Sequence, residues 1–261
     1  MPNKPSVLWT VDARGVASVT LNRPEVNNAY DEALIQGLHD AMDALGSEVR
    51  VLVLRGAGRH FQAGADLKWI RAVAAQSREE NESASRATAL AVHRLNMLPV
   101  PTVALVQGGC FGGGTGIVAA CDIVIAGDDA MFSIAETRWG LTAAIILPQL
   151  ADAIGARQVR RYALTGERFG AEEARRIGLV HEVVPAGELS AAGENMVGQL
   201  LKNAPDANAQ TKSAALAFAW GRVEEAVLER LVAQHAAKRR SREAVEGLAS
   251  FAEKRPARWS A

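Results

Sequence analysis

The chain has 261 residues, 49% of them hydrophobic and 22% charged, so it is long enough to bury the core of one large domain. Its 29 basic residues balance its 29 acidic ones, which argues against a protein dedicated to nucleic acid, because such proteins carry a basic excess. The two cysteines, Cys110 and Cys121, exclude a disulfide scaffold, and we expect both to be buried. No apolar run reaches the ~20 residues of a membrane helix and no signal-peptide pattern is present, so the expected location is the cytoplasm.

Strand and helix patterns alternate over the first 140 residues. Short apolar runs rich in β-branched residues predict strands, at residues 16–21, 51–55, 102–106 and 123–126. Helical spacing predicts a helix over residues 31–46, with Asp31 as its N-cap, and another over 86–98 that ends before Pro99. The polar segment 72–85 is predicted as a surface loop or a loosely held helix. This order favours an α/β fold with crossover connections.

After residue 190 the pattern becomes helical. One amphipathic helix is marked by Val223, Ala226, Val227 and Leu231, and another is predicted over residues 243–254. Helices this short cannot enclose a core alone, so they must pack on the main body or on a partner subunit. We therefore divide the chain into an α/β core, residues 1–190, and a helical region, residues 191–261.

Two Gly-rich segments each connect a predicted strand to the start of a helix. They are HFQAGADLKWI, residues 60–70, and QGGCFGGGTGIVAACD, residues 107–122. Small residues let a ligand approach the backbone, and a helix start offers free N–H groups, so two such loops can form an oxyanion hole. Two tight strand-to-helix turns would show the same pattern. The second segment is not a phosphate-binding loop, because it lacks the required lysine.

A single acidic residue, Glu136 in SIAETRWG, lies among small and apolar residues. Burial among apolar groups raises the pKa of a carboxyl and suits it to general acid/base catalysis. The other interpretation is a surface glutamate that pairs with Arg138. The five histidines show no metal-ligand spacing, so no metal site is expected.

Taken together, these segments resemble the crotonase superfamily, the enoyl-CoA hydratases and isomerases, over nearly the whole chain. The stretches that carry the resemblance are LNRPEVNNAYDEAL, FQAGADLK, PTVALVQGGCFGGGTGIVAACDIVIA, FSIAETRWGL and SREAVEGLASFAEKRPARW. The resemblance implies a spiral of ββα units followed by a helical C-terminal region, residues 191–261, that forms a homotrimer or a hexamer of two trimers. It also implies an acyl-CoA thioester as substrate.

The same resemblance assigns the site. The backbone N–H groups of Ala65 and Gly113 would hold the thioester oxygen, and Glu136 would be the acid/base. Substrate or CoA contacts are implied for Ala63, Ala65, Asp66, Leu67, Lys68, Gly113, Phe251 and Lys254. The last two would reach the CoA of a neighbouring subunit, and an ordinary solvated lysine is the alternative for Lys254. Coenzyme A belongs to the substrate, so no separate cofactor, metal, nucleic acid or membrane partner is expected.

The sequence departs from the two-glutamate hydratases of this family at two positions. Gly116 stands where their first glutamate would be, and Ala144 stands where a residue helps to hold the attacking water. The chain instead resembles bacterial hydratases of 3-methylglutaconyl-CoA in leucine breakdown and of its isohexenyl analogue in acyclic terpene breakdown. Their substrates carry a distal carboxylate, which Arg138 or another nearby arginine would bind. Pairing of Arg138 with a core or interface acid is equally open.

We therefore expect hydration of a branched, 3-substituted glutaconyl-CoA through an enolate, with one glutamate acting as base and then as acid. Isomerisation of a 3-enoyl-CoA to a 2-enoyl-CoA would use the same single base. The remaining alternatives are a straight-chain hydratase, another crotonase reaction such as thioester hydrolysis, and a non-catalytic acyl-CoA-binding or RNA-binding relative. The neutral charge balance disfavours RNA.

Overall fold

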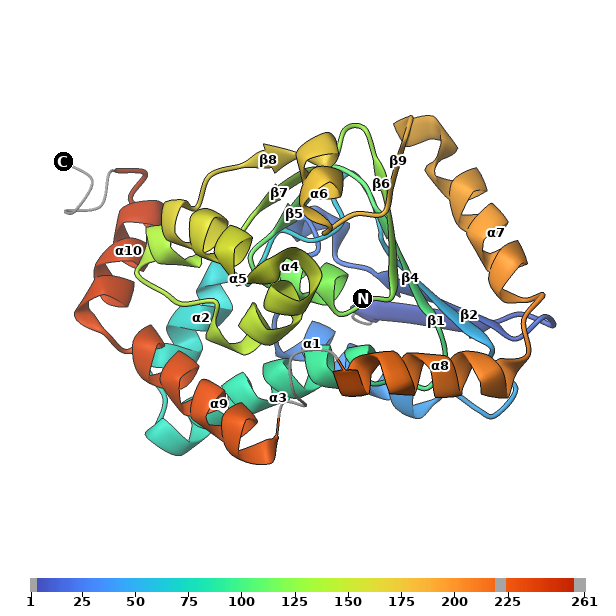
Figure 1. Ribbon diagram of the computed structural model, residues 1–261. Coiled ribbons are helices and arrows are strands. Elements are labelled where there is room, and N and C mark those ends of the chain that lie inside the picture. The colour runs from blue at the N-terminus through green and yellow to red at the C-terminus, as the bar shows by residue number, and fades with distance from the viewer. Residues whose placement is uncertain (1–3, 219–223, 256–261) are drawn as a thin grey trace.

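The computed structural model describes residues 4–218 and 224–255 (Figure 1). The strands in these residues are β1 (Val7–Val11), β2 (Val16–Leu21), β3 (Val51–Gly56), β4 (Thr102–Val106), β5 (Gly109–Phe111), β6 (Ile123–Gly127), β7 (Met131–Ser133), β8 (Phe169–Gly170) and β9 (Glu182–Val184). The α-helices are α1 (Glu32–Asp43), α2 (Leu67–Ala74), α3 (Arg78–Asn96), α4 (Gly113–Ala119), α5 (Leu147–Thr165), α6 (Ala171–Ile177), α7 (Leu189–Leu200), α8 (Pro205–Phe218), α9 (Glu225–Arg239) and α10 (Arg242–Ala252). Short 3-10 helices are η1 (Pro24–Val26), η2 (Glu136–Trp139), η3 (Ala144–Ile146) and η4 (Ala186–Glu188).

Two sheets organise the chain. The larger one has the strand order β1-β2-β3-β4-β6-β9, with β1 antiparallel to β2 and every other pair parallel. The smaller one contains β5, β7 and β8, and a bridge between Gln62 and Cys110 joins the preceding turn of chain to it. Successive turns thus place one strand in the large sheet and a strand or bridge in the small one. The predicted α/β spiral of ββα units is confirmed.

The central strands are buried on both faces. In β3, Leu52 and Leu54 belong to the main core, whereas Val51 and Val53 pack with Val197 of α7 on the opposite face. Figure 1 shows α7 on one side of the large sheet and α1 and α3 on the other. Burial on both faces explains why these strands are continuous apolar runs rather than alternating ones.

Most element predictions agree with the structure, and the helix after α2 begins earlier than expected. The predicted strands differ from β2, β3, β4 and β6 by at most one residue, and Asp31 caps α1 by accepting a hydrogen bond from the N–H of Leu34. The start predicted for α3 at residue 86 was wrong. Within segment 72–85, α3 begins at Arg78, because Ser77 and Glu80 form a capping box.

Side chains of the C-terminal helices α9 and α10 pack into the hydrophobic clusters of the rest of the chain. Val232 of α9 belongs to the main core, and Leu248 of α10 packs in a cluster with Ile70 and Leu141. α10 spans Arg242–Ala252 rather than residues 243–254, and Val223, expected in the preceding helix, lies outside the described residues. Cys110 and Cys121 are buried, as predicted. In the ranges that the structure describes, no helix has both the length and the apolar character needed to cross a membrane.

Candidate active site

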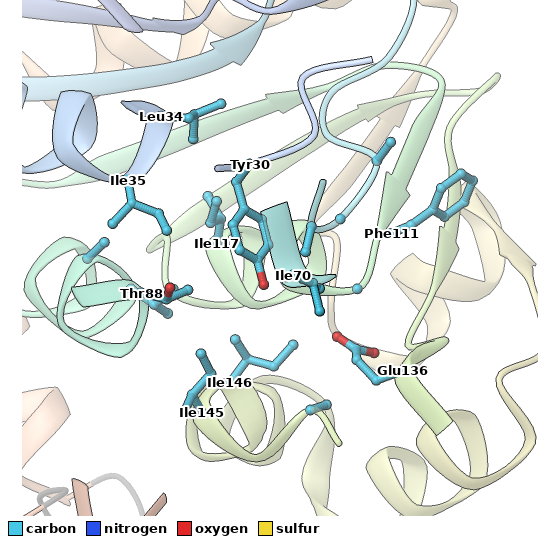
Figure 2. A pocket seen from close by; sticks show the side chains of 18 of the residues that line it. Tyr30, Leu34, Ile35, Ile70, Thr88, Phe111, Ile117, Glu136, Ile145 and Ile146 are labelled. Atoms are coloured by element: carbon cyan, nitrogen blue, oxygen red, sulfur yellow. The ribbon is translucent and has the colours of Figure 1, made fainter. Parts of the chain in front are cut away.

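A cavity of about 290 Å³ lies between α1, α3, the large sheet and the two Gly-rich loops. Its inner part is lined by aliphatic side chains of α1, α3, β3 and η3, among them Leu34, Ile35 and Ile146 (Figure 2). Among the described residues that line it, Glu136 is the only one with a carboxyl group. A largely apolar cavity with few polar groups is the usual form of a small-molecule site.

The first Gly-rich loop presents the N–H of Ala65. The backbone N–H of Tyr30 donates to the carbonyl of Gly64 at 2.9 Å, and the backbone N–H of Asp66 donates to the carbonyl of Tyr30 at 2.8 Å. This parallel bridge turns the intervening N–H of Ala65 away from the pairing. The buried side chain of Asn28 supports the loop by donating to the carbonyl oxygens of Ala57 and His60, both at 2.8 Å.

The second Gly-rich loop presents the N–H of Gly113, the first residue of α4. Gly112 precedes it with φ 52°, a conformation that favours glycine. A Cβ at Gly112 would lie 3.7 Å from the Cα of Gly64, so the two loops are in contact. The N–H groups of Ala65 and Gly113 donate to no acceptor within the described residues. Two free N–H groups on adjacent loops have the arrangement of an oxyanion hole.

The carboxyl of Glu136 faces these loops from η2. Its Oε1 lies 3.1 Å from the position that a Cβ at Gly112 would take. Its Oε2 is shielded from solvent and has no hydrogen-bond partner among the described residues. Burial raises the pKa of Glu136 to about 7, because the ionised form loses its hydration and a hydrogen bond from its own backbone N–H offsets only part of that loss. Figure 2 shows this carboxyl and the Tyr30 hydroxyl pointing into the cavity.

The position of the absent first glutamate, Gly116, is filled by its neighbours. A Cβ on Gly116 would lie 2.2 Å from Cγ2 of Ile146, so no side chain fits there without moving η3. Ala144 is buried in η3 and does not line the cavity. The one-glutamate arrangement is therefore built into the packing of α4 against η3.

The other predicted CoA-contacting residues are divided between the cavity and its surroundings. Ala63, Ala65 and Leu67 line the cavity. The carboxylate of Asp66 caps α2 by accepting from the N–H of Lys68 at 2.9 Å, and Lys68 itself is exposed outside the lining. Asp66 therefore has a structural function at the start of α2.

Of the two predicted residues near the C-terminus, Phe251 lines the cavity and Lys254 does not. Phe251 packs edge-on against Trp139, with ring centroids 4.7 Å apart, and lines the cavity of its own chain rather than only a neighbour's. This contact arises because α10 packs on η2 of the same chain. Lys254 is exposed and lies outside the lining.

Arg138, the predicted partner of a distal carboxylate, lines the cavity but is exposed. It forms no ion pair with any acid in the described part of the chain, so the alternative of pairing with Glu136 is wrong. Its side chain packs over Gly166, where a Cβ would lie 2.8 Å from Nε.

Sequence reasoning missed several cavity residues with polar side chains, among them Tyr30, His235 and Arg239. Tyr30 lies within the quoted LNRPEVNNAYDEAL stretch, and burial raises its pKa to about 12. Arg239 lies in the basic run KRR, residues 238–240, and such runs are typical of solvent-exposed helix faces. The signal that could have revealed it is spacing, because Val232, Ala236 and Arg239 recur every three or four residues on one buried stripe of α9.

Comparison with known proteins decides the family. The profile described as enoyl-CoA hydratase/isomerase matches residues 12–261. This chain belongs to the enoyl-CoA hydratase/isomerase family. It is therefore an enzyme of the crotonase superfamily that binds acyl-CoA thioesters, and the spiral fold agrees with that assignment.

Relatives within the family differ in the reaction they are named for. A mevalonyl-coenzyme A hydratase of Aspergillus fumigatus is 35% identical over 248 residues, 92% of this chain and 90% of that protein. A dienoyl-CoA isomerase of Dictyostelium discoideum is 30% identical over 256 residues, 94% of this chain and 87% of that protein. The solved structure of Pseudomonas aeruginosa AtuE has 37% identity and a TM-score of 0.80, covering 98% of this chain and 100% of that one. Family membership alone thus leaves hydration and isomerisation to be separated by the site.

Proposed function

We propose that this enzyme hydrates a 2-enoyl-CoA thioester of the branched, 3-substituted glutaconyl type, with Glu136 as its single acid/base. The observation that carries the proposal is a lone buried carboxyl of pKa about 7 beside two free backbone N–H groups. A carboxyl with that pKa is ionised in about half of the molecules at neutral pH. It can accept a proton and return it within one turnover.

Hydration would proceed through an enolate. Glu136 takes a proton from water, and the resulting hydroxide forms a bond to the β-carbon of the enoyl thioester. The electron pair of the double bond moves to the thioester oxygen, where the N–H groups of Ala65 and Gly113 hold the negative charge. Protonated Glu136 then gives its proton to the α-carbon, so one water is added overall. Each such N–H donor typically lowers the barrier by about 3 kcal/mol.

The shape of the cavity supports an apolar substituent on the acyl chain. Much of the lining beyond Glu136 is aliphatic, including Leu38 and Met42 of α1 and Val92 and Leu95 of α3. These are buried against the main core, and burial of a methylene group there is worth about 0.8 kcal/mol. The substrate we propose places its 3-substituent in this part of the cavity.

Isomerisation is the second candidate. It is favoured by the packing of Ile146 against Gly116, which leaves no room for a second carboxylate to hold water. An isomerase needs no water, because its one base moves a proton from the α-carbon to the γ-carbon of a 3-enoyl-CoA. The ionised form of Glu136 would start both reactions.

Product mass and thioester absorbance, read together, separate the two reactions. We expect 3-methylglutaconyl-CoA to gain the mass of one water and crotonyl-CoA to be a poor substrate. Loss of conjugated absorbance should accompany the mass change. An unchanged mass with rising absorbance on a 3-enoyl-CoA would establish the isomerase and overturn the proposed hydration.

We also propose that the enzyme assembles as a homotrimer or as a hexamer of two trimers. Large apolar side chains on the surface of the single chain support assembly, with Leu164 exposed by 73% and Leu8 by 44%. Light scattering on the purified enzyme should give three or six times the 27.7 kDa chain mass. A monomeric mass would refute this assembly.

A further inference from the structure

A buried arginine that no described acid neutralises lies at the cavity. Arg239, on α9, is 1% exposed and lines the same cavity as Glu136. Its Nη2 donates to Ser85 Oγ at 2.7 Å and to His235 Nδ1 at 3.0 Å. Its Nε and Nη1 are buried and have no hydrogen-bond partner, and no acid of the described chain forms an ion pair with it.

The groups around Arg239 do not neutralise it. Arginine only donates hydrogen bonds, so the Nδ1 of His235 must accept, which requires an unprotonated ring nitrogen. Burial and the neighbouring guanidinium hold the pKa of His235 well below its usual value, so this imidazole stays neutral. Ser85 is neutral, and Trp69 offers only its ring face, with the guanidinium carbon 5.4 Å from the ring centre. A buried cation left in this state is costly unless a bound group supplies the opposite charge.

Arg239 lines the cavity into which the Glu136 carboxyl and the Tyr30 hydroxyl point (Figure 2). The guanidinium of Arg239 lowers the pKa of Tyr30, whereas the Glu136 carboxyl raises it, so both charges act on the same phenol. Arg239 approaches from α9, and Glu136 approaches from η2. The other two arginines of the lining, Arg138 and Arg168, are exposed, so water screens their charges.

We infer that Arg239, rather than Arg138, is the specificity-determining residue that binds a second anionic group, a carboxylate, on the acyl chain. The inference rests on the proposed function, because the carboxylate must belong to a substrate whose thioester lies at Ala65 and Gly113. The unpaired donors of Arg239 would form charge-assisted hydrogen bonds with that carboxylate. A site with buried, unpaired donors rejects a substrate that cannot satisfy them, so Arg239 would select against neutral acyl chains.

A matched pair of substrates tests this inference. 3-Methylglutaconyl-CoA carries the free carboxylate, and its terminal methyl ester has nearly the same shape without the charge. For the wild-type enzyme we expect kcat/KM to be at least about 100-fold higher on the acid. Arg239→Met should lower kcat/KM on the acid about 100-fold and change it less than about threefold on the ester. Arg239→Lys, which keeps the charge, should retain part of the preference.

The control variant is Arg240→Met, which removes the adjacent, exposed arginine of the same helix end. It should leave both rates unchanged. Turnover of the ester by Arg239→Met reports that the variant is folded. If that variant does not fold, the wild-type preference and Arg239→Lys decide the question.

Three outcomes would overturn the inference. They are equal wild-type rates on acid and ester, an equal loss on both substrates in the folded Arg239→Met enzyme, and loss of the preference in Arg138→Ala instead. Absence of water addition to either substrate would refute the proposed hydration instead. Calorimetry of 3-methylglutaryl-CoA binding to wild type and to Arg239→Met would then test Arg239 by itself. We expect about 100-fold weaker binding to the variant, and equal binding would overturn the inference.

Discussion

Replacing Glu136 by glutamine removes the only carboxyl that the described residues contribute to the cavity lining, while keeping the size of the side chain. We expect Glu136→Gln to retain the fold and acyl-CoA binding and to lose at least about 100-fold in kcat, the lower range for a general acid/base. The same change should make the protein more stable at neutral and alkaline pH, because burial disfavours the ionised wild-type carboxylate.

The size of the stabilisation follows from the pKa. The pKa of Glu136 is raised from 4.5 to about 7, so between these values the folded chain holds a proton that the unfolded chain releases. Because the native state binds more protons there, the free energy of unfolding of wild type falls as the pH rises from 4.5 to 7. The difference, 7 − 4.5 = 2.5, corresponds to about 3 kcal/mol. Glutamine cannot ionise, so its variant keeps this stability.

Thermal denaturation of both proteins at pH 4.5 and at pH 8, at one protein concentration, measures the effect. The cost of burying a neutral amide is present at both pH values and cancels in the comparison. The melting temperature of the variant relative to wild type should rise by about 6 °C between the two conditions. If the difference in melting temperature between variant and wild type does not change with pH, the Glu136 carboxyl is not buried in its ionised form. In wild type, kcat/KM should rise with pH through about 7, since the ionised base starts the reaction.

Three further substitutions test the loops and the packing around Glu136. Gly113→Ala would place a Cβ 2.5 Å from Cε1 of Tyr30, so kcat should fall about 100-fold, whereas Gly187→Ala, whose Cβ would meet nothing within 4 Å, should leave kcat unchanged. Equal kcat in these two variants would contradict the role of the Gly113 N–H. Gly116→Glu should lower the melting temperature without raising kcat, because Ile146 fills the space beside Gly116. Adding Ile146→Ala to this variant should recover stability. A higher kcat in Gly116→Glu alone would show that the space beside Gly116 is open. Asn28→Ala should cost about 2 kcal/mol or more in urea denaturation, because it leaves buried backbone groups unpaired, and a loss below about 0.5 kcal/mol would contradict its supporting role.

Local chemistry accounts for the parts of the site that could be predicted from the sequence. Gly112 needs a positive φ and Gly113 needs close approach to Tyr30, and both requirements leave a glycine-rich signature. The capping box at Ser77 and Glu80 is also a local signal, and it marks the start of α3 within the polar segment 72–85. The prediction for Arg138 rests on the resemblance of the E-x-R-x-G loop, and such a local motif does not report burial.

By itself, the sequence determined the α/β spiral, the two Gly-rich loops, the single acid Glu136 and the family, because each depends on residues that are neighbours in the chain or on motifs in a fixed order. Only the tertiary structure decided that Ile146 closes the space beside Gly116, that Phe251 lines the cavity of its own chain, and that Arg239 is buried with no counter-charge among the described residues. Arg239 lies about a hundred residues from Glu136 in the chain, and their common cavity exists because α9 packs across α3 and η3. Burial and charge balance are properties of that packing, which long-range contacts create and local patterns do not contain.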